Sequence, residues 1–462
     1  SDLDTFPGPD AGNDFIYRIK AVNAVGSSEV ASVVVSANDR PYGNMISQGK
    51  PEVSGSLGAG NEFASSMVVG DFNNDGHEDL VVGSPGATVD GAVGAGKIHV
   101  FNGPNILTGD TVLTQNSEGF VDSVESFDGF GSVLAVGDFN NDGFDDLAIG
   151  SPNEDLGGTF FRNAGIVEIV YGSVSGFTDH QRFHQYTPGV ANKSEKNDLF
   201  GSALAAGDFN NDGVSDLAIG SPGWASSDDM ETRHGRVQVV LGNASGLAST
   251  AWSAALGEAG ESLGSELTAL HRTGTGDALA ATARNHTAEV SSSQTDHGKV
   301  NVFSGNSTGI HPMRNMTQTK GGDLFGRSLE ACDVNNDGHD ELIVGNTGSY
   351  EDSLSFSSVE YFYGSETGYD GTPDHTLTSL VQGRLFGLSI ACVGDLNGDG
   401  FDEHIITEPL NATGGFGTGT LWLFEGTDQS LPGEPDWQHS PTTPNTRTGE
   451  AVSSAGDVNE DG

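Results

Sequence analysis

An acidic, glycine-containing turn recurs along this chain and constrains its fold more than any other feature. The sequence DFNNDG begins at Asp71, Asp138 and Asp208, and close variants begin at Asp333, Asp395 and Asp457. The steps between these first aspartates are 67, 70, 125, 62 and 62 residues. The long step contains a degenerate copy, in which His271 stands where the first aspartate would be. We therefore expect seven copies, roughly 60–70 residues apart, and a repeat architecture.

Each full copy has the pattern of four short strands. A Phe-Gly pair such as Phe130-Gly131 opens the copy, and an apolar run, the acidic turn and a second apolar run (DLAIGSP) follow. A variable loop then leads to a third strand such as GIVEIVYGS and to a weaker fourth one. A single four-stranded blade cannot bury both of its faces, so neighbouring blades must stack around an axis. The pattern predicts an all-β, seven-repeat β-propeller with four-stranded antiparallel blades, its last blade truncated, and an exposed edge between the first and sixth blades.

The charge of the chain excludes two classes of partner. It has 65 acidic and 19 basic residues, a formal net charge of −46. Such a surface repels phosphate backbones, so we expect no nucleic acid among the partners. The sequence holds no run of about 18 apolar residues, so we also expect no direct membrane insertion. An acidic surface of this kind attracts cations.

The acidic turn has the ligands of a calcium site. Oxygen side chains at positions 1, 3 and 5 face the inside of a curling loop, glycine at position 6 permits the sharp turn, and the carbonyl at position 7 and the carboxylate at position 9 complete the shell. We expect about five Ca²⁺ sites and a sixth, partial one. The predicted ligand residues are Asp71, Asn73, Asp75, His77 and Asp79; Asp138, Asn140, Asp142, Phe144 and Asp146; Asp208, Asn210, Asp212, Val214 and Asp216; Asp333, Asn335, Asp337, His339 and Glu341; Asp395, Asn397, Asp399, Phe401 and Glu403; and Asp457, Asn459 and Asp461.

Two other interpretations of the turn were weighed. Asp-Gly and Asn-Gly pairs also form simple hairpin turns, but five copies keep all the ligand-type positions. An EF-hand requires Glu at position 12, where this chain has apolar residues such as Ile149 and Ile219. We expect weaker sites where Glu341 and Glu403 replace Asp at position 9, and no ion at the degenerate copy of His271.

The Phe-Gly opening, the DxNxDGxxD loop and the following IGSP together resemble the FG-GAP repeat of the integrin α-subunit propeller and its bacterial relatives. The resemblance covers residues 56–462, with the seventh repeat incomplete. Residues 14–37 (DFIYRIKAVNAVGSSEVASVVVSA) are similar to the last two strands of a fibronectin type III domain. This implies a partial fibronectin type III-like sandwich over residues 1–38, a linker over 39–55, and an extracellular protein, secreted or on the cell surface.

Residues outside the turns give little chemistry. We found no nucleophile elbow, metalloprotease motif or phosphate-binding loop, and therefore expect a protein that is not an enzyme. Cys332 and Cys392 share strand parity before their acidic turns, which favours two buried free thiols over a disulfide. The variable loops on the face opposite the turns carry candidate ligand-binding residues: Phe160, Phe161, Arg162, Trp224 and Tyr350.

Two functions remain open at this point. The first is a calcium-stabilised extracellular adhesion or ligand-binding propeller within a larger surface or secreted protein, with a protein or glycan as its ligand. The second is an accessory, carbohydrate-binding module of a secreted polysaccharide-degrading enzyme.

Overall fold

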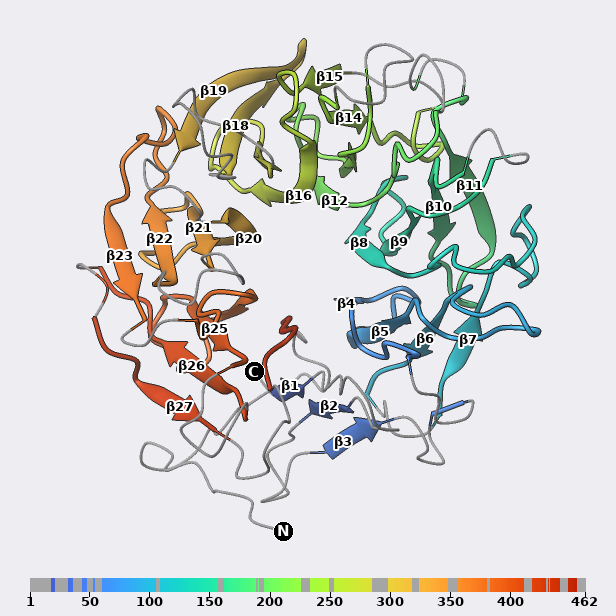
Figure 1. Ribbon diagram of the computed structural model, residues 1–462, viewed down its shortest axis with the longest axis horizontal. Coiled ribbons are helices and arrows are strands. Elements are labelled where there is room, and N and C mark those ends of the chain that lie inside the picture. The colour runs from blue at the N-terminus through green and yellow to red at the C-terminus, as the bar shows by residue number, and fades with distance from the viewer. Residues whose placement is uncertain are drawn as a thin grey trace.

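The computed structural model describes residues 18–20, 32–35, 44–47, 53–54, 60–104, 109–156, 162–187, 190, 195–225, 233–248, 253–284, 298–317, 324–347, 356–379, 383–410, 418–428, 431, 433–440 and 448–454. Six antiparallel sheets form a ring, and the four strands of each sheet follow one another in sequence from the centre outward (Figure 1). The fold is therefore an all-β, six-blade β-propeller. The prediction of seven repeats is wrong in its blade count, because among the described residues six copies supply the four strands of a blade.

The strands of the first three blades are β4 (Met67–Gly70), β5 (Asp79–Ser84), β6 (Lys97–Phe101) and β7 (Thr111–Leu113); β8 (Val133–Gly137), β9 (Asp146–Ser151), β10 (Ile166–Tyr171) and β11 (Asp179–Phe183); and β12 (Leu204–Gly207), β13 (Asp216–Ser221), β14 (Arg236–Val240) and β15 (Ser253–Leu256). Those of the last three are β16 (Leu263–Leu270), β17 (Ala278–Ala283), β18 (Lys299–Asn306) and β19 (Gly309–Thr317); β20 (Phe325–Cys332), β21 (Glu341–Asn346), β22 (Ser358–Phe362) and β23 (His375–Thr378); and β24 (Ile390–Gly394), β25 (Glu403–Glu408), β26 (Thr420–Phe424) and β27 (Trp437–His439).

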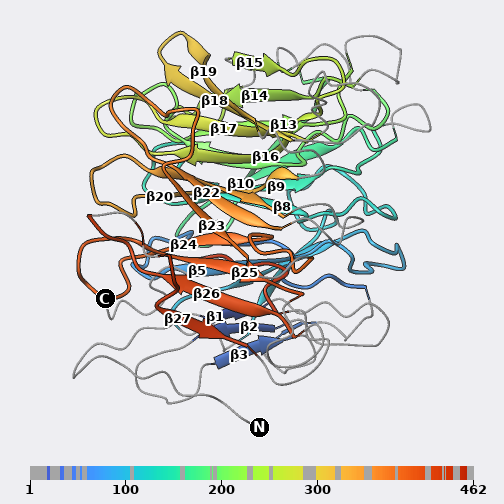
Figure 2. The same ribbon diagram turned by 60° about the vertical axis from the view of Figure 1, so that its left-hand side comes forward.

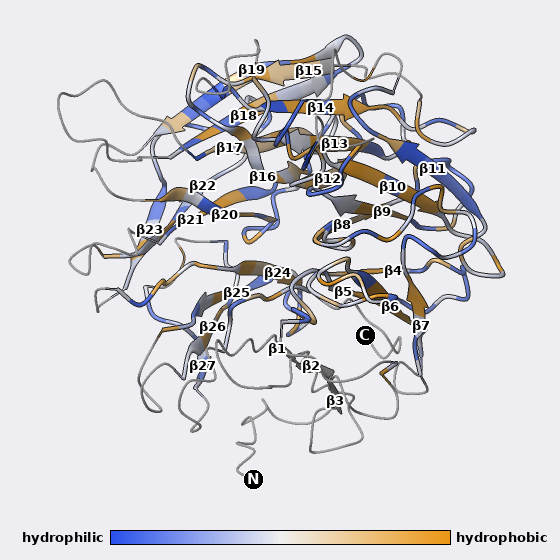
Figure 3. Ribbon diagram, turned by 45° about the vertical axis from the view of Figure 1, so that its right-hand side comes forward, coloured by the Kyte–Doolittle hydropathy of each residue, from blue (hydrophilic) through white to orange (hydrophobic). Residues whose placement is uncertain are grey.

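The second strand of each blade is buried along its whole length, as in β9 and β13. Such strands are covered by a neighbouring blade on each face, which explains their continuous apolar runs. The outer strands are more polar, and Figure 3 shows this contrast between the hydrophobic β10 and the hydrophilic β11. Most of the core therefore lies between blades. One such cluster joins Phe72 and Ile98 of the first blade to Phe130 and Leu147 of the second.

The Phe-Gly pair of the second blade docks this blade on the first. Phe130 is fully buried and forms a parallel bridge with Gly96, just before the third strand of the preceding blade. Gly131 has a φ of 81°, and a Cβ there would lie 2.6 Å from Cγ2 of Ile98. Glycine is thus required by both backbone conformation and close approach.

The boundary between the sixth and first blades differs from the predicted exposed edge. The N–H of Thr448 donates to the carbonyl of Thr418 in the sixth blade, and Ser453 Oγ donates to the carbonyl of Met67 in the first. A three-stranded antiparallel sheet, β1 (Arg18–Lys20), β2 (Ser32–Val35) and β3 (Asn44–Ser47), is drawn in the same sector of the ring in Figures 1, 2 and 3. β3 falls within the range expected as a linker. The fibronectin type III assignment stays a prediction, because most of residues 1–38 lie outside the described residues.

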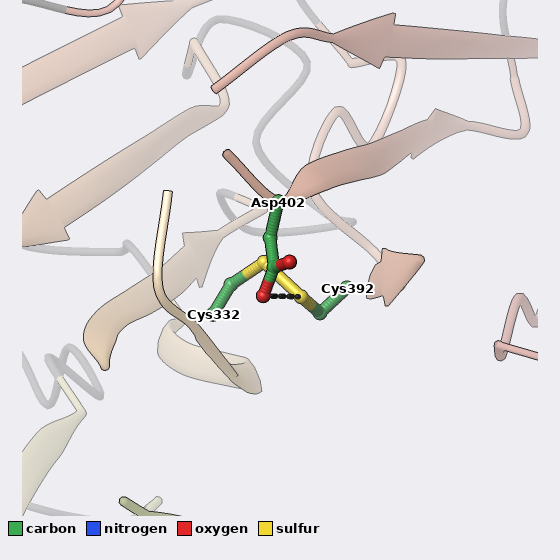
Figure 4. A group of neighbouring side chains, drawn as sticks. All are labelled: Cys332, Cys392 and Asp402. Carbon is green, nitrogen blue, oxygen red and sulfur yellow. Dashed lines mark hydrogen bonds between the residues drawn. A yellow bond between two sulfur atoms is a disulfide. The ribbon is translucent and has the colours of Figure 1, made fainter. Parts of the chain in front are cut away.

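A disulfide joins the innermost strands of the fifth and sixth blades (Figure 4). Cys332 and Cys392 are bonded, with their Cα atoms 5.4 Å apart, so the prediction of free thiols is wrong. The two side chains do not point to the same side of their blades, contrary to what their positions in the sequence predicted. The first strand of the sixth blade, β24, has a register shift between Cys392 and Gly394, and the extra residue, Val393, turns the side chain of Cys392 to the opposite side of the strand. Asp402 Oδ2 lies 3.8 Å from Cys392 Sγ, a packing contact because an oxidised sulfur carries no proton.

The described residues include no helix with the length and hydropathy that a membrane crossing requires.

Candidate metal sites in the hairpin loops

Five acidic turns adopt one shared conformation between the first and second strands of their blades. In the second blade, Asn141 at position 4 has a φ of 55° and Gly143 at position 6 has a φ of 86°. The other four loops repeat this pair of left-handed residues at Asn74 and Gly76, Asn211 and Gly213, Asn336 and Gly338, and Gly398 and Gly400. Asparagine and glycine tolerate this conformation best, which explains why they recur at positions 4 and 6 of these loops.

The aspartate at position 1 holds each loop closed. The two carboxylate oxygens of Asp138 accept hydrogen bonds from the N–H groups of Asp142 and Gly143, at 3.1 and 3.0 Å. Asp142 in turn accepts the N–H of Phe144 at position 7. The same three bonds recur in the loops headed by Asp71, Asp208, Asp333 and Asp395. The predicted ligand positions 1, 5 and 7 thus come together in all five loops.

The asparagine at position 3 carries an acceptor with no partner in three loops. The Oδ1 atoms of Asn73, Asn210 and Asn335 are buried and accept no hydrogen bond. A buried polar atom of this kind is costly unless something satisfies it. In the other two loops, the Oδ1 atoms of Asn140 and Asn397 accept the N–H of position 5.

The closing carboxylate at position 9 lies at the buried base of each loop. Asp146 accepts hydrogen bonds from the N–H groups of Phe139 and Gly172, both at 2.9 Å, and is fully buried. Burial, with a smaller contribution from the charges of Asp138 and Asp142, raises its pKa to about 7. Burial likewise raises the pKa of the other closing residues: Asp79 to about 6, Asp216 to about 7, Glu341 to about 9 and Glu403 to about 7. Each loop therefore brings together carboxyl groups whose ionised form is poorly stabilised by water.

An aspartate at position 8 connects neighbouring loops, and it was missed in the sequence. Asp145 Oδ2 accepts the N–H of Asp71 in the preceding blade, and the Asp145 N–H donates to the Asp71 carbonyl. The same pair of bonds joins Asp277 to Asp208, and Asp340 to His271. The signal was present in the sequence as a second acidic residue directly before position 9.

The degenerate fourth loop lacks the ligand set. His271 Nδ1 lies 3.1 Å from Asp277 Oδ1, and Thr273 Oγ1 donates to the carbonyl of Gly338. Its side chains therefore bond to each other and to the fifth loop. The sixth, partial set, Asp457, Asn459 and Asp461, lies outside the described residues.

The predicted ligand-binding residues are not brought together among the described residues. Arg162 is exposed, and its Nε atom lies 3.8 Å from Oδ2 of Asp155. Trp224 is buried, with the Arg236 guanidinium over its ring. Phe160, Phe161 and Tyr350 lie outside the described residues.

Comparison with known proteins agrees with the repeat pattern. The FG-GAP repeat model matches residues 63–101, 130–167, 200–239, 325–364 and 387–424, which leaves out the fourth blade. Phosphatidylinositol-glycan-specific phospholipase D of Mus musculus is 36% identical over 157 residues, 34% of this chain and 18% of that protein. Integrin alpha-8 of Gallus gallus is 32% identical over 189 residues, 40% of this chain and 16% of that protein. Integrin alpha-PS3 of Drosophila melanogaster is 29% identical over 165 residues, 35% of this chain and 14% of that protein.

The chain is an integrin-like FG-GAP β-propeller, in which the repeat is matched in five of the six blades. Within that class it is related both to integrin α subunits and to phosphatidylinositol-glycan-specific phospholipase D, although it spans less than a fifth of the length of either. The expectation of a protein that is not an enzyme is contradicted by this comparison, because a phospholipase is among its relatives. Sequence motifs could not indicate this, since the shared segment is a small part of that enzyme.

Proposed function

We propose that this chain is a calcium-stabilised β-propeller of an extracellular protein, which binds a protein or glycan ligand. The observation that carries the calcium part is the set of buried, unpartnered Oδ1 atoms of Asn73, Asn210 and Asn335. Each lies in a loop with three carboxyl groups, and an oxygen-rich donor set of this kind suits Ca²⁺. The residues present therefore fit the ion.

In this proposal each ion would be held by the side chains at positions 1, 3, 5 and 9 and the carbonyl at position 7. The bound ion neutralises carboxylates that otherwise repel each other in a poorly hydrated loop. The chain's own contribution is to shape the loop, because the carboxylates at positions 1 and 5 accept hydrogen bonds from its backbone N–H groups. The ion then stabilises the ring by binding the native state in preference to the unfolded one.

Three observations support an extracellular location. Loops of this kind fill at the calcium concentrations found outside cells. The Cys332–Cys392 disulfide fits an oxidising compartment. Integrin α subunits and phosphatidylinositol-glycan-specific phospholipase D are extracellular or secreted proteins.

The proposed ligand surface is the face opposite the hairpin loops. Strands of a blade alternate in direction, so the variable loops after the second strand emerge there, with Arg162 exposed among them. Val93, Val121 and Phe127 also lie in loops on this face and are 54%, 81% and 68% exposed. Exposed apolar side chains close to acidic groups suit a protein or glycan surface.

A second candidate function is an accessory binding module of a secreted hydrolase. The similarity to phosphatidylinositol-glycan-specific phospholipase D favours it, because that relative joins a segment like this one to an enzyme. Both candidates include the calcium loops. They differ in the role of ligand binding, which is adhesion or recognition in the first candidate and support of a catalytic domain in the second.

The calcium proposal is tested by melting the chain in millimolar Ca²⁺ and in chelator, together with a count of bound ions. We expect a higher melting temperature with Ca²⁺ and about five ions per chain. Identical melting curves, or fewer than three ions, would overturn it. Binding to arrays of glycans and of extracellular proteins, with and without Ca²⁺, tests the ligand part. The hydrolase candidate predicts that such a ligand is also the substrate of the enzyme of which this chain forms a part.

A further inference from the structure

A second acidic group lies far from the hairpin loops, on the opposite face of the ring. Glu125 and Asp128 precede β8, and Glu154 follows β9; both loops emerge on that face because the strands of a blade alternate in direction. One carboxylate oxygen from each residue lies within 4.8 Å of those of the other two. Asp128 and Glu154 are only 2% and 1% exposed. Among the described residues, no three carboxylates of one hairpin loop meet this closely.

A buried amide from the first blade completes the group. Gln115 follows β7, is 1% exposed, and donates from Nε2 to Glu154 Oε2 at 2.6 Å. Its Oε1 atom is buried and has no hydrogen-bond partner. This acceptor belongs to an amide that already contacts Glu154, one of the three carboxylates, so a cation bound by that carboxylate would give it a partner.

The equivalent place in the fourth blade is occupied by a positive charge. There Glu258 and Glu261 precede the first strand at the same spacing as Glu125 and Asp128. The ammonium of Lys299 lies 2.9 Å from Glu261 Oε1 and 3.5 Å from Glu258 Oε1.

Lys299 is the first residue of the third strand of its blade, and the second blade has no basic residue at this position. The first and third blades carry Lys97 and Arg236 there, whereas the second carries the buried Ile166. The second blade thus keeps the acidic pair, adds Glu154, and has no basic residue at the place from which Lys299 reaches.

The surroundings of the group are acidic. Burial, with a smaller contribution from the charges of Asp128, Glu125 and Asp155, raises the pKa of Glu154 to about 8, although the hydrogen bond from Gln115 opposes this shift. Arg162 contacts Asp155 rather than the group, and no described Lys or Arg forms an ion pair with the three carboxylates.

We propose that Glu125, Asp128 and Glu154, with the amide oxygen of Gln115, bind one hard divalent cation at the boundary between the first and second blades. All four donors are oxygens, which suits Ca²⁺ or Mn²⁺ and excludes thiophilic metals. Because Gln115 belongs to the first blade and Glu154 to the second, the ion ties two blades together on the face that we propose for ligand binding. The site is independent of the hairpin loops.

The decisive experiment is anomalous diffraction from crystals of the wild-type chain soaked in MnCl₂. We expect a peak among the three carboxylates, about 2.1–2.6 Å from their oxygens. Peaks at the hairpin loops with none at this group would overturn the site and leave the hairpin proposal standing. A peak here with none in the hairpins would do the reverse.

A count of bound ions gives a second readout in solution. The double variant Asp128→Asn, Glu154→Gln keeps the size of both side chains and should lose one Mn²⁺ per chain. Glu118→Gln, an exposed carboxylate in the same connection, is the matched control and should lose none. A double variant that melts cooperatively and binds as many ions as wild type would also refute the site.

Discussion

Asp145 Oδ2 in the second blade accepts a hydrogen bond from the backbone N–H of Asp71 in the first, at 2.9 Å. Asp71 is itself the residue whose carboxylate closes the first hairpin loop. The loops around the ring are therefore not independent, because the backbone that carries one loop's principal carboxylate is held by the next blade.

This contact predicts coupling between neighbouring loops. Asp145→Ala should lower the free energy of unfolding by roughly 1–3 kcal/mol, because it leaves the Asp71 N–H without its charged acceptor. It should also weaken Ca²⁺ binding at the first loop. Asp145→Asn is the control, since its amide oxygen can accept the same bond. Equal calcium titrations for the alanine variant and wild type would show that the loops act separately.

The five hairpin loops should bind Ca²⁺ unequally. Loops that end in Glu341 and Glu403 close with a side chain longer by one methylene, and the fully buried Glu341 already accepts from Val334 N–H and Asn335 Nδ2. We expect weaker peaks at these two loops in anomalous maps, full peaks at the three loops closed by Asp, and none beside His271. A full calcium peak beside His271 would contradict the assignment.

Stability without calcium should depend on pH in a direction opposite to that of most proteins. The pKa of Asp146 is raised to about 7 in the folded chain, so the folded state holds its proton while the unfolded state has lost it. In chelator the free energy of unfolding should therefore fall as the pH rises from about 4 to 7. Asp146→Asn should make that decline shallower, by up to about 1.4 kcal/mol per pH unit. A decline of unchanged slope in this variant would argue against the raised pKa.

The Cys332–Cys392 disulfide should contribute to stability. It closes a loop with a sequence separation of 60 residues, for which chain entropy predicts about 4 kcal/mol. The double variant Cys332→Ser, Cys392→Ser should unfold at a lower denaturant concentration than wild type. Adding a reductant should lower the midpoint of wild type and leave the variant unchanged.

The Phe-Gly pair should be a main source of cohesion between blades. Phe130→Ala removes a fully buried ring from the cluster shared by the first two blades, and should cost about 3–5 kcal/mol. Phe127→Ala, three residues earlier and 68% exposed, is the matched control and should be nearly neutral. Similar losses for both variants would mean that the effect comes from the loop rather than from blade packing.

Local pattern was enough to predict four-stranded blades and their hairpin loops, but not the number of blades. The spacing of Asp138, Asn140 and Asp142 specifies a loop that bonds mainly to itself, and the apolar run after it specifies a strand between two others. What could not be predicted depends on register between segments far apart. The one-residue shift at Val393 reverses Cys392 and creates the disulfide. The acidic group at Glu154 needs Gln115 from the preceding blade, which no local motif indicates.

The fourth blade differs from its neighbours on both faces of the ring. On one face His271 contacts Asp277 where the other loops have the proposed calcium ligands, and on the other face the side chain of Lys299 places a positive charge next to Glu261. Lys299 gives this blade a counter-charge of its own, so its stability should depend little on the divalent ions in the medium. If the medium were depleted of divalent ions, backbone amides of β17 and β18 should keep their slow hydrogen exchange while those of β5 and β9 speed up. We therefore expect the fourth blade to stay ordered when the ions are removed, so that the other blades can regain their order against it when the ions return.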